Sequence, residues 1–97
     1  MYVVVHHRIK DREAAFPRGE KLKKGEGAPA GARALQFYPA SDGSVVTCLW
    51  EAQSVAALQR YVDETLGKTS ENTCYEIDSD AAFARQPLGL RDAPAPA

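Results

Sequence analysis

The sequence predicts an α+β domain with the element order β-α-β-β-α-β, in which four antiparallel strands carry two helices on one face. Residues 44–51, SVVTCLWE, are dense in β-branched and aromatic residues, which favours a half-buried strand. Residues 55–66 have apolar side chains at helical spacing, and Ser54 can cap that helix while Gly67 can end it. Residues 72–78 then return as a short strand.

The first half of the chain predicts a second unit of the same kind. Residues 2–9 include three consecutive valines, as expected for a central strand. A helix over residues 11–24 follows, in which Pro17 requires a kink or a restart. Residues 32–38 form the next strand, joined to the third by a turn at Asp42-Gly43. This order is that of the ferredoxin-like split motif, with the first and third strands central and the fourth beside the first.

Length and composition indicate one ordinary globular domain. We expect it over residues 1–85, with a tail rich in proline and alanine over residues 86–97. The net charge of -1 gives no reason to expect nucleic acid or an anionic membrane as a partner. The sequence has no apolar run near the ~20 residues that span a bilayer and no signal-peptide pattern. We therefore expect a cytoplasmic protein with reduced cysteines.

Alternation divides each predicted strand into two faces. The set expected to face the helices is Val3, Val5, Leu35, Phe37, Val45, Leu49, Tyr75 and Ile77. The opposite set is Val4, His6, Arg8, Gln36, Tyr38, Val46, Cys48, Trp50, Cys74 and Glu76. No helix covers that second face, so its apolar part needs a partner, and a homodimer packing sheet to sheet is expected.

The segment from Thr47 to Ala52, followed by Ser54 and a helix, resembles the dimeric α/β-barrel superfamily. Within that superfamily it is similar to small bacterial ferredoxin-like proteins of unknown function, some of which are described as nickel-binding. The resemblance implies the fold and a homodimer. It also allows a transition metal such as nickel as a ligand, although the sequence itself requires no cofactor.

The candidate site is a cavity on the uncovered face. With the predicted strand order, His6 lies between Cys48 and Cys74, which are two strand spacings apart and too distant for a disulfide. One interpretation is a small molecule bound by Gln36, Cys48, Trp50, Cys74 and Glu76. Another is a metal ion held by His6 and Cys48, since imidazole and thiolate suit nickel, copper or zinc. In the plainer alternative the cysteines are small hydrophobic residues and His6 is a structural histidine.

An enzyme is the competing hypothesis. In a cofactor-free monooxygenase, isomerase or lyase, His6 would act as acid or base, Arg8 would hold an anionic oxygen and Tyr38 or Glu76 would serve as a second proton partner. If His6 instead belongs to the core, the assignment of faces is inverted and His7 takes the candidate role. The sequence leaves the choice between a binding protein and an enzyme open.

Overall fold

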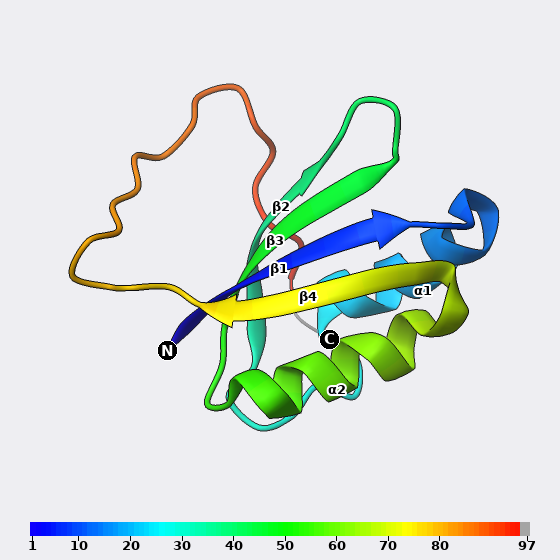
Figure 1. Ribbon diagram of the computed structural model, residues 1–97. Coiled ribbons are helices and arrows are strands. Elements are labelled where there is room, and N and C mark those ends of the chain that lie inside the picture. Colours follow the sequence, from blue (N-terminus) through cyan, green and yellow to red (C-terminus); the bar gives the residue numbers. More distant parts are fainter. Residues whose placement is uncertain (96–97) are drawn as a thin grey trace.

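The computed structural model describes residues 1–95 and has one four-stranded antiparallel sheet with two helices packed on the same face (Figure 1). The strands are β1 (Tyr2–Ile9), β2 (Arg33–Pro39), β3 (Val45–Glu51) and β4 (Ser70–Glu76), in the spatial order β2-β3-β1-β4. The helices are α1 (Arg12–Lys24) and α2 (Val55–Leu66), and a short 3-10 turn, η1 (Gly67–Thr69), leads into β4. The predicted fold class and strand order are confirmed.

Both helices begin at the caps that the sequence predicted. The Asp11 side chain accepts a hydrogen bond from the backbone N–H of Ala14, and Ser54 accepts one from Ala57. Of the two predicted alternatives at Pro17, a kink or a restart, the restart was wrong, because α1 continues from Arg12 to Lys24 through Pro17. A proline there removes only the hydrogen bond to the carbonyl four residues earlier, and the remaining bonds of a thirteen-residue helix keep it intact.

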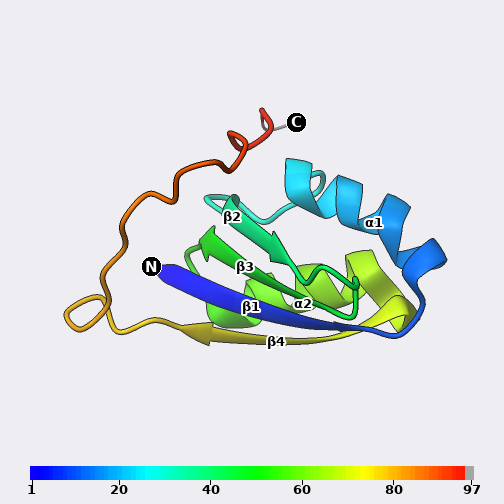
Figure 2. The same ribbon diagram turned by 90° about the horizontal axis from the view of Figure 1, so that it is seen from above.

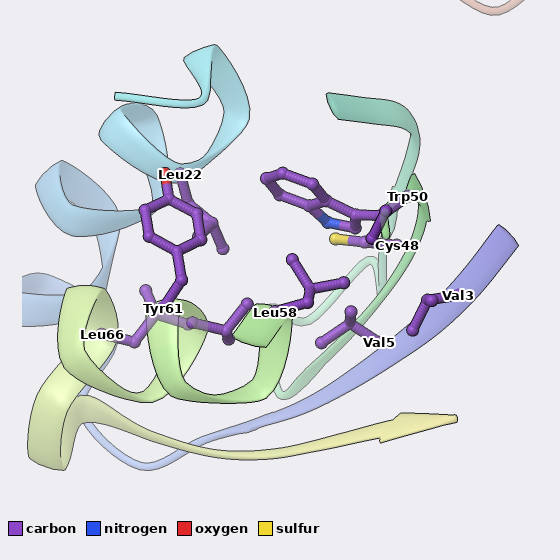
Figure 3. Packing of buried hydrophobic residues seen from close by; sticks show 10 residues of the cluster. Val3, Val5, Leu22, Cys48, Trp50, Leu58, Tyr61 and Leu66 are labelled. Carbon is purple, nitrogen blue, oxygen red and sulfur yellow. The ribbon is translucent and has the colours of Figure 1, made fainter. Parts of the chain in front are cut away.

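The core lies between the sheet and α2. Val3 and Val5 of β1 meet Leu58 and Val62 of α2, and all four side chains are fully buried. Trp50 of β3 adds the largest buried side chain, and Figure 3 shows it on the helix side of the sheet together with Cys48. Its ring meets Tyr61 edge to face with centroids 6.0 Å apart.

The predicted faces of β3 and β4 were inverted. Cys48 is 4% exposed and Trp50 is 1% exposed, so both face the helices and not the uncovered side. Cys74 also packs against the core, whereas Tyr75 is 54% exposed. Because β3 carries apolar residues at both parities, alternation alone could not orient it, and the large indole of Trp50 gains most from burial.

The face without helices is here called the open face, defined by Val4, His6, Thr47, Leu49 and Tyr75. In register, Val4 of β1 pairs with Leu49 of β3 and with Tyr75 of β4, which gives one apolar row across three strands. His6 pairs with Thr47 and Thr73 in the next row. Val5, and not His6, lies between Cys48 and Cys74, and both cysteines are free thiols.

The chain beyond Glu76 has no helix or strand as far as Pro94 and Ala95. It leaves the sheet at the end of β4 and returns on the side of β2 and α1, as Figure 2 shows. The last two residues of the predicted tail, 96–97, lie outside the described residues. Neither helix in residues 1–95 is long and apolar enough to cross a membrane.

Candidate ligand site between α1 and the sheet

A cavity of about 250 Å³ lies between α1 and the strands β1, β2 and β3. Its wall on the sheet side includes His7, Cys48 and Trp50, and its wall on the helix side includes Ala15 and Leu22 of α1. Polar residues also line it, namely Arg12, Glu20, Lys23 and Gln36. The cavity is thus mainly apolar and holds few groups that can form hydrogen bonds, which is typical of a small-molecule site.

His7 is the titratable group in the wall of this cavity that is most deeply buried, with 2% of its surface exposed. It follows Val3 and Val5 on the helix side of β1 because side chains alternate along a strand. Its Nδ1 lies 2.7 Å from Oδ1 of Asn72, and its Nε2 lies 3.4 Å from Sγ of Cys48. Both ring nitrogens therefore have a partner.

The surroundings of Asn72 determine which ring nitrogen carries the proton. Its Nδ2 donates to Oδ1 of Asp63 at 3.0 Å, and the Ser70 hydroxyl donates to its Oδ1 at 2.7 Å. The amide oxygen therefore faces His7 and accepts a hydrogen bond from Nδ1–H. In the neutral ring Nε2 is then the acceptor, and it meets the weakly donating thiol of Cys48.

The protonation states agree with this arrangement. Burial, and to a smaller extent the charge of His6, lower the pKa of His7 below its usual 6.5, although the hydrogen bond to Asn72 and the charge of Asp63 act in the opposite direction. Burial raises the pKa of Cys48 to about 12. At neutral pH the imidazole is therefore uncharged and the thiol keeps its proton, so the pair is not an ion pair.

Trp50, which lines the cavity, has a buried side-chain nitrogen, Nε1, without a hydrogen-bond partner within residues 1–95. A buried donor without an acceptor costs about 1–3 kcal/mol. An acceptor atom brought into the cavity at this nitrogen would recover that free energy.

The predicted catalytic residues lie elsewhere. His6 is exposed on the open face, where its Nδ1 is 3.4 Å from the Thr47 hydroxyl. Tyr38 pairs with Thr47, so His6 and Tyr38 occupy the same row of the sheet on either side of Thr47. Arg8 forms an ion pair with Glu71. That pairing engages the guanidinium that was expected to hold an anionic oxygen.

The predicted ligand-binding residues are divided between the two sides of the sheet. Cys48, Trp50 and Gln36 line the cavity under α1, where His6 is absent. Cys74 lies on the core side next to α2, and its backbone N–H donates to Oε1 of Gln59. Glu76 is exposed at the end of β4.

The two predicted metal ligands are not brought together. Cys48 pairs with Val5 and lies on the helix side, whereas His6 lies on the open face. In the part of the chain that the structure describes, no three histidine, cysteine or acidic side chains gather as a metal site.

Sequence reasoning missed His7 as the leading candidate although the signal was present. His7 has the same parity as Val3 and Val5, which were correctly predicted to face the helices. Only the inverted orientation of β3 kept Cys48 and Trp50 away from it in the prediction.

Comparison with known proteins bears on this fold. Residues 2–85 match the model of a family described as a domain of unknown function, DUF8652. The chain belongs to this family. No curated protein matches it.

Solved structures similar to this DUF8652 member include SCO4226 from Streptomyces coelicolor A3(2), at a TM-score of 0.53 and 20% identity over 87% of this chain and 100% of that one. Rv0793 from Mycobacterium tuberculosis matches at a TM-score of 0.44 and 20% identity, over 84% and 100% of the two chains. At these identities the likeness to SCO4226 supports the α+β fold and nothing about ligands.

Proposed function

We propose that this DUF8652 protein binds a small, largely apolar molecule bearing one hydrogen-bond acceptor, in the cavity between α1 and the sheet. The observation that carries the proposal is the buried Nε1 of Trp50, which has no acceptor within residues 1–95 although Trp50 lines a cavity. A cavity of about 250 Å³ suits a molecule of one or two rings.

An organic ligand is favoured over a metal ion at this site. Within residues 1–95, the cavity offers a metal ion only one imidazole, that of His7, and one thiol, that of Cys48. The Cys48 pKa of about 12 opposes formation of the thiolate that a soft metal needs. The predicted ligand Cys48 is retained in this proposal as part of the wall, together with Trp50 and Gln36. The site moves from the open face to the covered side of the sheet.

The test uses the single tryptophan of the chain, whose indole N–H gives one resolved NMR signal. We expect 2-indanone, a two-ring ketone, to shift this signal saturably, because its carbonyl can accept the hydrogen bond. Indane has the same ring system without the oxygen, and it should bind at least about tenfold more weakly, the factor that corresponds to 1.4 kcal/mol. Absence of a saturable shift by 2-indanone would contradict the proposal.

A pair of neighbouring alanines supplies matched variants. Ala15 is buried in the cavity wall, so Ala15→Phe should fill the cavity and abolish binding of 2-indanone. Ala14 precedes it on α1 and does not line the cavity, so Ala14→Phe should leave binding unchanged. Equal binding by the two variants would place the ligand elsewhere.

We propose in addition that two copies of the chain associate through the open face. Two observations support this partner. The row Leu49, Val4 and Tyr75 is apolar and no helix covers it, and the chain resembles the dimeric α/β-barrel superfamily. An apolar sheet face gains free energy when a second copy removes it from water.

A further inference from the structure

We propose that His7 acts as a proton acceptor in the cavity and that the protein catalyses enolisation of a small carbonyl compound bound there. This inference rests on the proposed binding function and adds a reaction to it. Trp50 would donate a hydrogen bond to the carbonyl oxygen, and Nε2 of His7 would take a proton from the adjacent carbon. The substrate class is a small ketone or aldehyde with an acidic C–H beside the carbonyl.

The first argument is the orientation of His7. A general base must direct an unprotonated nitrogen at its substrate. Asn72 accepts the Nδ1 proton, and Asn72 itself is held by Ser70 and by Asp63 of α2. These hydrogen bonds keep the lone pair on Nε2, which points towards Cys48 in the cavity wall.

The second argument is that the hydrogen bonds that hold Asn72 continue to further polar groups of α2. Gln59 of α2 donates to both carboxylate oxygens of Asp63, at 3.2 and 3.1 Å, and to the backbone carbonyl of Asn72 at 2.9 Å. It also accepts from the backbone N–H of Cys74 at 3.0 Å. The carboxylate of Asp63, which is hydrogen-bonded to Asn72, would stabilise the imidazolium once His7 is protonated. The aspartate of a catalytic triad stabilises the imidazolium of its histidine base in a similar way.

The third argument is that Nε2 is not committed to a strong partner. The thiol of Cys48 lies 3.4 Å away and is a weak donor whose S–H can rotate. A substrate carbon can thus compete for Nε2. The lowered pKa of His7 keeps the ring neutral at pH 7, so it is able to accept a proton without first losing one.

The step balances without an oxidant or a cofactor. The C–H bond beside the carbonyl breaks, and its proton forms an N–H bond with Nε2. The electron pair of the broken C–H bond forms the carbon–carbon double bond, while the π pair of the carbonyl moves to oxygen. The resulting enolate oxygen accepts the hydrogen bond from Nε1 of Trp50, which strengthens as negative charge develops. Return of the proton to the carbon regenerates the ketone.

The experiment measures exchange of the methylene protons of 2-indanone for deuterium in D₂O buffer, by proton NMR. We expect the protein to accelerate exchange about 10²-fold or more over free imidazole at equal concentration, the lower end of the usual contribution of a positioned general base. The Trp50 indole signal, followed in the same samples, reports binding. Binding without acceleration overturns this inference and leaves the proposed function standing, whereas no binding overturns both.

Three variants identify the base. His7→Gln should reduce exchange to the imidazole level, and the matched His6→Gln on the open face should keep the rate of the natural sequence. If His7→Gln does not fold, Asp63→Asn on the exposed surface of α2 is the substitute. Asp63 is a positioning residue, so its substitution should lower the exchange rate at least about tenfold while the affinity for 2-indanone stays the same, a separation that a merely structural role would not produce.

Ring ¹⁵N NMR of histidine-labelled protein gives an independent readout. We expect His7 to be neutral with its proton on Nδ1, and exposed His6 serves as the internal reference. A proton on Nε2 of His7, or an unchanged exchange rate in folded His7→Gln, would overturn the assignment of His7 as the base.

Discussion

His6 and His7 are neighbours in sequence and have opposite environments. A strand directs successive side chains to opposite faces, so His6 is exposed beside Thr47 while His7 is 2% exposed beside Cys48 and Asn72. The residue type favoured acid–base chemistry at both positions. Only the packing of β3 decides which of the two faces a cavity, and it selects His7.

Burial of His7 predicts a specific dependence of stability on pH. Its pKa is 6.5 in the unfolded chain and lower in the folded protein. Well above pH 6.5 the ring is neutral in both states and contributes no pH dependence. Below it the unfolded chain binds the proton first, so the free energy of unfolding falls as pH falls, with a limiting slope of about 1.4 kcal/mol per pH unit.

Urea unfolding between about pH 5 and pH 7 checks this dependence. The carboxyl groups with lowered pKa values, Glu20, Asp42 and Glu71, lose their stabilising charge at more acidic pH and do not interfere in this window. The His6→Gln variant should show a fall of the same sign that is somewhat smaller, because the charge of His6 also lowers the pKa of His7. A flat profile, or one that disappears in His6→Gln, would assign the effect to another group.

Trp50 shows how far a residue can be predicted. Its position on a strand was predicted correctly from β-branched and aromatic neighbours, because that preference is local. The side of the sheet predicted for Trp50 was wrong, because Val45 and Leu49 on one side of β3 are about as apolar as Val46 and Cys48 on the other. The unsatisfied Nε1 could not be predicted, since it depends on which atoms α1 and α2 bring near it.

The helix that supports the His7 network, α2, is among the elements that the sequence predicts best. α2 has the predicted N-cap Ser54 and the predicted stop Gly67 at its C-cap, although the φ of 57° and ψ of -135° of Gly67 are not those of the left-handed helical region. These ends fix the phase of the helix, so that Gln59 and Asp63 meet Asn72 of β4. α1 was the less regular helix in the prediction, and its course over β2 and β3 determines the cavity that no sequence pattern indicated.

The cap of α2 gives a prediction about an element. Ser54→Ala removes the side-chain acceptor for the N–H of Ala57, which lies 3.1 Å away, and should lower the free energy of unfolding by about 1 kcal/mol. Ser41→Ala, at an exposed turn position, is the control and should have little effect. Urea unfolding measures both variants. Equal midpoints would mean that water replaces the cap without cost.

At the scale of the whole molecule, the two sides of the sheet differ in structure. The covered side contains the core, the cavity and the His7 network. The open face contains an apolar row through Leu49, Val4 and Tyr75 and contributes nothing to that core. Since α1 and α2 both pack on the covered side, association through the open face would leave the cavity accessible. Binding and dimerisation can then be tested separately.

The last prediction concerns that association. Light scattering at micromolar concentrations should give about twice the 10.5 kDa mass of the chain, because the apolar row is removed from water when two sheets pack together. Leu49→Lys places a charge in the middle of this row and should give the mass of one chain, with unchanged circular dichroism, since the side chain can reach solvent in the monomer. Ala56→Lys, on the exposed surface of α2, is the matched control and should remain dimeric.

A mass of 10.5 kDa for the natural sequence would contradict the dimer, and an unaffected dimer in Leu49→Lys would show that another surface forms it. In either case the binding of 2-indanone to the Leu49→Lys variant should be unchanged, because its cavity lies on the other side of the sheet.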